Sequence, residues 1–452
     1  MSGRPSFDPR AIWAIAIPAM ATNVATALIG LGDMWVVGRL GDAPAQGAVD
    51  IGARLFALIF TVMNFLKMGT TGLVAQAGTK SGADAQAETL ARGLAVGLTI
   101  AGLLLVLKPW LMPALLAALG ADGAVYENAR IYADIRYWTA PGVLANLALV
   151  GYLVGRRQVR AALLIEVHYN VANVALGLWF VLGLDMGIAG IGWSSFIAEY
   201  LKLTGVLLFV LVGANGAAIR GALASRTALD VSKLRPFLSV NRDLFLRTVV
   251  LMLALAVLTR LGAEQGAVTL AANGIIYQMF ILTSLFLDGF ENAAQVLNGE
   301  RAGAGDRDGF MAYVRAILWR GLAGAVVAAL FFALLARPVL TSFAATPAVL
   351  EAAMRQAHWL IIIPFAGMAS FVLDGVFVGA SWTRAMLISM AGASIVYALA
   401  LWLTWPLGNG GLWLSFTLFL ALRAVLQALM IPRLASGSFA DTSERKIPRE
   451  TM

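Results

Sequence analysis

The chain of 452 residues contains no cysteine, only two histidines and few charged residues. The absence of cysteine excludes disulfides, thiol catalysis and cysteine-ligated metal sites. His168 and His358 lie far apart in the sequence, so we expect no histidine metal cluster. Charged residues make up 13% of the chain, against about 25% in soluble globular proteins. With 60% hydrophobic residues, a soluble protein could not cover its surface with polar groups.

The hydrophobic residues form long runs, and runs of about 18 or more are typical of membrane-spanning helices. In lipid the backbone has to satisfy its own hydrogen bonds, so these runs are expected to be helical. Each run is long enough to cross about 30 Å of hydrocarbon. The sequence therefore predicts an all-α integral membrane protein with twelve transmembrane helices. The expected segments are roughly 11–38, 51–77, 93–116, 131–154, 162–182, 188–213, 243–261, 269–297, 316–336, 356–379, 386–405 and 411–432.

Lysine and arginine are concentrated in alternate loops between these segments, including Arg156, Arg157 and Arg160. By the positive-inside rule, these loops face the cytoplasm, and so do both termini. The same distribution accounts for the net charge of +8 without a nucleic-acid partner. We therefore expect a multi-pass protein of a bacterial-type inner (plasma) membrane.

The longest polar connection divides the expected helices into two sets of six. We predict an N-terminal lobe over residues 1–213, a cytoplasmic linker over 214–242 and a C-terminal lobe over 243–435. A cytoplasmic tail over 436–452 follows the last helix.

Short motifs recur in the two halves. Arg-Leu-Gly at 39–41 returns at 260–262, and Gln-Gly-Ala-Val at 46–49 returns at 265–268. Because each half has an even number of helices, both enter the membrane from the same side, and the repeats are parallel. Such internal repeats are typical of transporters that work by alternating access.

Ionisable residues inside membrane helices cost about 2.5–3.5 kcal/mol each or more, so they are functional candidates. Asp33 is expected in the outer half of the first helix, which also carries Pro18. Proline removes a backbone hydrogen bond and permits a kink. A carboxyl held away from water can take up and release a proton or bind a cation. The alternative is that Asp33 is simply solvated at the outer interface.

Two asparagines lie on the fifth predicted helix. Asn170, Asn173 and Gly177 have the spacing i, i+3, i+7, which places them on one helix face. The amides can hydrogen-bond a carboxyl or coordinate a cation. They can equally serve as contacts between helices.

The second half offers three acids, Asp288 and Glu291 on the eighth predicted helix and Asp374 on the tenth. Lys67 lies at a comparable depth on the second helix. A pair between Lys67 and one of these acids would form an inner gate or a structural tie. The alternative is a buried pair that only allows the two charges to coexist.

Other ionisable residues are interpreted as facing water. Glu166 and His168 are expected near the cytoplasmic end of the fifth helix. Long basic side chains near helix ends can extend toward the interface, and we assign this position to Arg54, Lys108, Lys202 and Arg423.

Several strings along the chain resemble the multidrug and toxic compound extrusion (MATE) family, in its DinF-like branch. They are the Pro18 and Asp33 helix, Val-Gly-Arg-Leu at 37–40, Phe-Leu-Lys-Met-Gly-Thr-Thr-Gly-Leu-Val-Ala-Gln at 65–76, Leu-Asp-Gly-Phe-Glu-Asn-Ala-Ala-Gln at 287–295, Gly-Glu-Arg-Ala-Gly at 299–303 and Leu-Asp-Gly-Val-Phe-Val-Gly at 373–379. They occur in the same order and on the same helices as in that family.

The resemblance implies two six-helix lobes that form a V-shaped cleft. It implies efflux of cationic or amphipathic organic compounds, driven by inward flow of H⁺ or Na⁺. Asp33 would be the proton or cation site, supported by Asn173, and Asp374 matches an acid that contributes to coupling in another branch. Relatives often carry an aspartate where this chain has Gly177. A single carboxylate makes a poor Na⁺ site, because hard cations require several oxygen ligands, and this favours H⁺.

The sequence thus predicts a secondary antiporter for small organic substrates, and neither an enzyme nor a protein with a metal or cofactor. Its partners would be the substrate and the lipid bilayer, and we expect a monomer. Two alternatives stay open. One is export of an organic anion such as citrate. The other is a flippase for a lipid-linked precursor, which would require several basic residues in the central cavity.

Overall fold

The computed structural model describes the backbone of most of the chain. The described residues are 7–38, 43–225 and 230–444, with the side chains of all but 27–34, 38, 43–44 and 440–444. These residues form helices and short connections, without any strand, and they confirm the all-α prediction.

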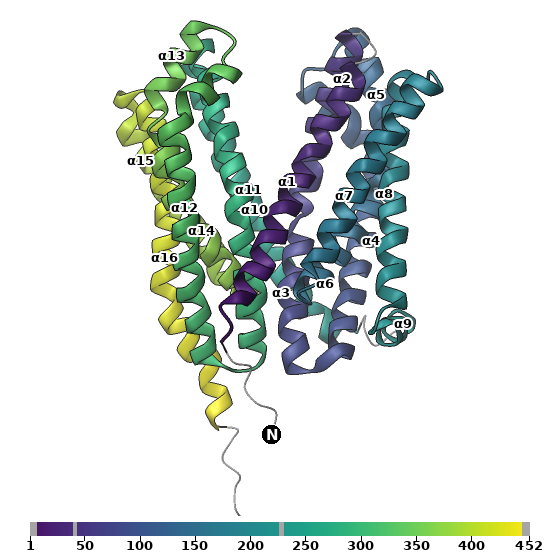
Figure 1. The fold of residues 1–452 in the computed structure, drawn as a ribbon, viewed down its shortest axis with the longest axis vertical. Helices are drawn as coiled ribbons and strands as arrows, with labels where there is room; N and C mark the ends of the chain where they lie inside the picture. The colour runs from purple at the N-terminus through teal and green to yellow at the C-terminus, as the bar shows by residue number, and fades with distance from the viewer. Residues whose placement is uncertain (1–6, 39–42, 226–229, 445–452) are drawn as a thin grey trace, which may run out of the picture. The chain divides into compact units, whose positions relative to one another are not determined.

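The helices follow one another with short connections (Figure 1). The first nine are α1 (Arg10–Gly38), α2 (Ala43–Met63), α3 (Phe65–Lys80), α4 (Gly82–Ala118), α5 (Gly123–Arg136), α6 (Ala140–Gly155), α7 (Val159–Leu178), α8 (Gly187–Val212) and α9 (Gly216–Ala224). The remainder are α10 (Val231–Glu264), α11 (Ala267–Gly303), α12 (Arg307–Phe343), α13 (Pro347–Gln356), α14 (Trp359–Gly379), α15 (Thr383–Thr404) and α16 (Asn409–Glu444).

Among the described residues, 11 helical stretches are long and apolar enough to cross a membrane. They coincide with eleven of the twelve predicted segments, and some combine two helices, as α2 and α3 do in Ala45–Lys80. The remaining predicted segment, 11–38, corresponds to α1, which includes side chains outside the described part.

The chain forms two compact units. We call residues 21–241 the N unit, and residues 1–20 with 242–452 the C unit. Both α1 and α10 contribute residues to each unit, because the boundaries fall within these helices. The predicted linker, 214–242, contains α9 and the first turns of α10.

In the N unit, α6 packs closely against α3 through small residues. A Cβ atom on Gly151 would lie 2.7 Å from the backbone oxygen of Lys67, and one on Gly155 would lie 2.7 Å from that of Thr71. The Thr71 hydroxyl donates a hydrogen bond to the Gly151 carbonyl at 3.1 Å. Small residues allow helix backbones to approach closely, which is a principal source of helix association in lipid.

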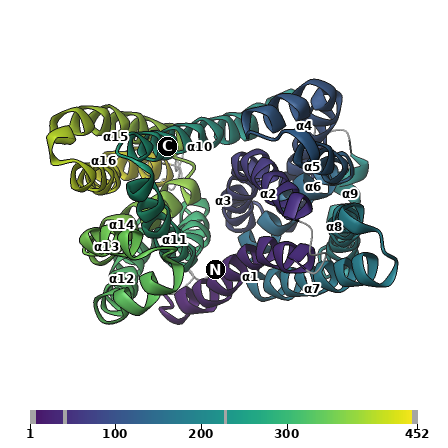
Figure 2. The same ribbon diagram turned by 90° about the horizontal axis from the view of Figure 1, so that it is seen from above.

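In the C unit, α14 is the most enclosed helix and packs against α11, α12 and α16 (Figure 2). Its closest approach is to α11, at Gly375 and Gly379. A Cβ on Gly379 would lie 2.5 Å from the backbone oxygen of Gln295. Because Asp374 precedes Gly375, this close packing also fixes the place of that acid.

Replacing Gly379 by alanine should destabilise the protein, because the new methyl group meets backbone that has no room to move. Overpacking of this kind costs about 1–3 kcal/mol. The measurement is the melting temperature of the detergent-solubilised protein. Gly274→Ala is the matched control, because Gly274 lies on α11 with no heavy atom within 4 Å of its added Cβ. Equal melting temperatures for the two variants would contradict the packing argument.

Candidate functional site

In the N unit α7 lies beside α1 (Figure 2), and polar side chains of α7 contact α1. Glu166, Asn170, Asn173 and Gly177 recur at steps of three and four residues, so they share this face. Asn173 is 1% exposed, and Glu166 is 5% exposed. This face of α7, which we call the α7 stripe, therefore brings polar atoms into the interior of the helix bundle, where each of them needs a partner.

Three contacts set the register of α1 against α7. The Thr26 hydroxyl donates to Glu166 Oε1 at 3.2 Å, and Asn170 Nδ2 donates to the Ala25 carbonyl at 2.7 Å. Farther along, a Cβ on Gly177 would lie 3.5 Å from the side chain of Val36. Residue numbers increase in the same direction on both helices, so α1 and α7 run parallel.

The register gives the level of Asp33, whose side chain lies outside the described residues. The hydrogen bond between Thr26 and Glu166 brings these two residues to one level. Asp33 lies as many residues beyond Thr26 on α1 as Asn173 lies beyond Glu166 on α7. Both separations amount to roughly 10 Å along the helix axis, at about 1.5 Å per residue. The other two contacts place Asp33 up to five residues farther along α7 than Asn173, so the backbone of Asp33 lies between the levels of Asn173 and Leu178.

Two other residues predicted for this site, Asn170 and Pro18, are described directly by the structure. Asn170 uses its amide to hold α7 against α1. Pro18 lies within the continuous helix α1, in the part that belongs to the C unit.

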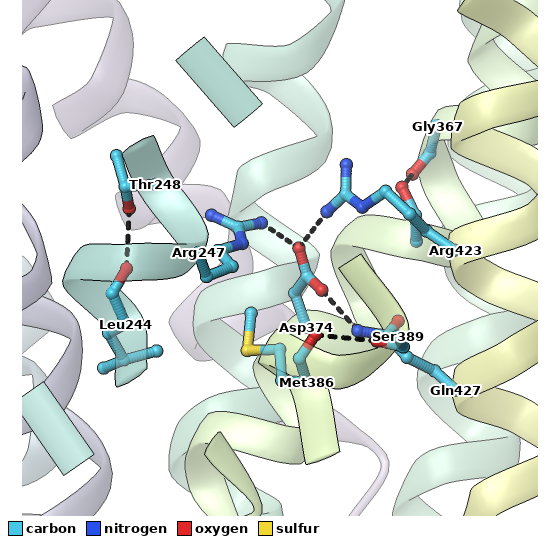
Figure 3. Close-up of polar contacts among 10 residues, drawn as sticks. Leu244, Arg247, Thr248, Gly367, Asp374, Met386, Ser389, Arg423 and Gln427 are labelled. Atoms are coloured by element: carbon cyan, nitrogen blue, oxygen red, sulfur yellow. Dashed lines mark hydrogen bonds and ion pairs between the residues drawn. The ribbon is translucent and has the colours of Figure 1, made fainter. Parts of the chain in front are cut away.

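The acids predicted in the second half include Asp374, which is fully buried on α14 in the C unit. Arg247 and Arg423 both donate to Asp374 Oδ2, Arg423 at 2.5 Å, and Gln427 Nε2 donates to Oδ1 at 2.6 Å. Figure 3 shows the two guanidinium groups reaching the carboxylate from opposite sides. Both oxygens of Asp374 are thus held by donors from α10 and α16.

Asp288 and Glu291 lie one turn apart on α11, and both side chains are half-buried. Glu291 is within electrostatic range of Asp288, Asp374 and both arginines. Its backbone carbonyl lies where α11 meets Gly375. The three acids predicted for the second half therefore belong to one cluster around the arginine pair.

Lys67 is half-buried on α3 in the N unit. Its backbone carbonyl accepts a hydrogen bond from the Thr71 hydroxyl at 2.9 Å. The pairing of Lys67 with an acid of the other half stays a prediction.

Two of the residues assigned to the membrane interface pair with buried acids instead, so that interpretation is wrong for them. Arg423 is 1% exposed and is paired with Asp374. Lys202 lies with its Nζ 2.7 Å from Glu166 Oε2, and its side chain is 11% exposed. The placement of Glu166 in cytoplasmic water is wrong for the same reason, whereas His168 is exposed.

Sequence reasoning missed Arg247 and Gln427. A signal existed for Gln427, because it follows Arg423 by four residues and so lies on the same face of α16. Arg247 carried no such signal, since its partner lies on a helix distant in the sequence. In the described part of the chain, no group of three or more His, Cys, Asp or Glu residues could hold a metal ion.

Comparison with known proteins gives consistent results. The MatE family model matches the chain twice, over residues 18–179 and 244–403. The chain is 34% identical over 422 residues to DNA damage-inducible protein F of Escherichia coli K12, a match that covers 92% of this chain and 90% of that protein. It is 23% identical to a probable multidrug resistance protein NorM of Chromobacterium violaceum, over 94% of each chain.

A similar fold occurs in the crystal structure of the Vibrio cholerae MATE transporter VcmN in the bent form. The TM-score is 0.82 at 18% sequence identity, and the match covers 95% of this chain and 97% of that one. At this level of identity the likeness concerns the fold alone.

Replacing Arg423 by methionine should lower the stability of the protein strongly, because it removes one of the two cations that neutralise a buried carboxylate. Breaking a buried ion pair costs on the order of 3 kcal/mol or more. Thermal unfolding of the detergent-solubilised protein measures the effect. The control is Arg433→Met, an exposed arginine on the same helix. A stability unchanged by Arg423→Met would contradict the assignment.

Proposed function

Because this chain belongs to the MatE family, we propose that it is an antiporter that exports small organic compounds from the cytoplasm in exchange for protons. Relatives include proteins named as multidrug resistance proteins, NorM and MdtK, which supports cationic or amphipathic substrates of the multidrug type. We place it as a monomer in a bacterial inner membrane with both termini in the cytoplasm, in line with the distribution of Lys and Arg.

The proposal depends on the position of Asp33 on α1. Its backbone lies within about one and a half turns of the level of Asn173, a buried amide on the neighbouring helix. A carboxyl at this level can bind a proton and release it when access alternates. A bound proton shifts the equilibrium between outward-open and inward-open states only if it binds one of them better. The contact between α1 and α7 is the element that we propose to differ between those states.

Protons fit this site better than Na⁺. Sodium requires several oxygen ligands, and the position one turn beyond Asn173 is Gly177, which supplies none from a side chain. The atoms nearest a Cβ on Gly177 belong to Val36 and Ser194, neither of which carries a carboxylate.

In the C unit we propose that Asp374 has a structural role, because three donors hold it. This pairing also weighs against the flippase alternative. A flippase would use basic residues to bind pyrophosphate, whereas Arg423 and Lys202 are occupied by acids.

Asp33→Asn should abolish dye uptake driven by a pH gradient (acid inside) in inverted membrane vesicles, because the amide cannot carry a proton. The exposed Asp122→Asn serves as the control and should leave uptake unchanged. A sodium gradient alone should drive no uptake by the wild-type protein. Transport by Asp33→Asn at the wild-type rate would refute the proposed role of Asp33.

Gly177→Asp should make transport respond to sodium, because it adds a second carboxylate, one turn beyond Asn173 on α7. The site accepts a Cβ atom, since the nearest atoms would lie 3.5 Å from it. Gly177→Ala tests the steric effect alone and should remain insensitive to sodium. The measurement is dye uptake into the same vesicles with and without a sodium gradient. If Gly177→Asp is active but indifferent to sodium, the missing second carboxylate does not decide the choice of ion.

A further inference from the structure

The N unit contains a second buried group of ionisable side chains, toward the cytoplasmic side of the Asp33 level as the predicted topology has it. Its members are Glu166 on α7, Glu199 and Lys202 on α8, and Asn146 on α6. Glu166 and Glu199 are each 5% exposed, and Asn146 is 3% exposed. Two acids and one base are thus enclosed together within the helix bundle.

Glu166 is fully occupied by partners. Lys202 Nζ lies 2.7 Å from its Oε2, and the Thr26 hydroxyl donates to its Oε1 at 3.2 Å. Lys202 Nζ also lies 4.7 Å from the centre of the Tyr169 ring, an attractive arrangement for a cation. Glu166 and Lys202 therefore form an ion pair that neutralises itself.

Glu199 has a neutral partner instead. Asn146 Nδ2 donates to Glu199 Oε1 at 2.7 Å and to the Glu199 backbone carbonyl at 3.3 Å. No ion pair holds Glu199 within 4 Å in the described part of the chain, although Lys202 lies one turn away on α8 and within electrostatic range. An ionised Glu199 would therefore leave the cluster with one uncompensated negative charge inside the membrane, which is costly.

The amide of Asn146 provides an independent observation. Its Oδ1 is buried and accepts no hydrogen bond from the described residues. Buried acceptors are nearly always satisfied. A proton on the Glu199 carboxyl would place an O–H donor next to this oxygen, so that acid and amide could exchange two hydrogen bonds.

The other charged and titratable groups around α8 are directed elsewhere. Tyr200 follows Glu199, but its hydroxyl donates to the Trp138 carbonyl at 2.9 Å. On α5, Asp134 pairs with Lys108 at 3.0 Å. Two basic residues also have other partners: Arg136 stacks over the Phe56 ring, and Arg220 donates to the Leu211 carbonyl.

We propose that Glu199 is a second proton-binding site, in which one proton on its carboxyl neutralises the Glu166–Lys202–Glu199 cluster. When this proton leaves to water, Glu199 becomes a carboxylate, and Lys202 is shared between the two acids. The ion pair of Lys202 with Glu166 then weakens, and Glu166 is the residue that binds α1 through Thr26. Proton binding by Glu199 does not depend on the proposed antiport. The effect of this proton on α1 does rest on the proposed antiport.

Infrared difference spectroscopy of the purified full-length protein between acid and alkaline buffers tests the proposal. We expect the C=O band of a buried carboxylic acid, shifted by deuterium exchange, to disappear at alkaline pH. In Glu199→Gln one component of this band should be missing, and titration should release about one proton fewer per chain. The exposed Glu127→Gln is the control and should match the wild type.

Asn146→Ala is a second variant, which keeps the acid but removes its partner, and should shift the same component to higher frequency. A spectrum of Glu199→Gln identical to the wild type would overturn the proposal, and so would an unshifted band in Asn146→Ala. Asp33→Asn separates the two ideas, because it should retain the Glu199 component. Loss of gradient-driven transport in Asp33→Asn alone concerns the antiport and leaves the assignment of Glu199 intact.

Discussion

The cost of placing a charge in hydrocarbon shapes both units of this protein. An isolated ionised side chain inside the bilayer is expensive, and the least costly solution is a partner of opposite charge with further hydrogen bonds. Asp374 follows this rule completely, with two arginines and one amide on its two oxygens. Glu166 follows it with Lys202 and Thr26. An acid that lacks such a cation, as Glu199 does, can be accommodated by taking up a proton.

The two units differ in how their small, polar and charged residues hold the helices together. In the C unit the glycines of α14 bring its backbone against α11, and the arginines of α10 and α16 lock its aspartate. In the N unit the stripe on α7 consists mainly of amides and short side chains along α1, with contacts of single hydrogen bonds. Single hydrogen bonds contribute only about 0.5–1.5 kcal/mol each, whereas a buried ion pair is costly to break. We therefore assign change to the contact between α1 and α7, and rigidity to the surroundings of Asp374 in the C unit.

The sequence was sufficient for the helices but only partly sufficient for the site. Length and hydropathy locate the spans, because the thickness of the bilayer sets both. Acids such as Asp33, Glu291 and Asp374 could be selected because each is rare in an apolar helix. Depth along a helix, however, does not give the direction in which a side chain points. Lys202 and Arg423 were placed at the interface from their position near helix ends, and only the rotation of α8 and α16 shows that each faces an acid.

The register of α1 against α7 restricts how α1 can move. Sliding α1 by one helical turn, about 5.4 Å, would separate Thr26 from Glu166 and Asn170 from the Ala25 carbonyl at the same time. A rotation or bend that starts near Pro18 avoids this simultaneous loss, because the ring has already removed one backbone hydrogen bond there. The chain passes from one compact unit to the other two residues beyond that proline. Any movement of α1 should thus resemble the opening of a hinge rather than the stroke of a piston.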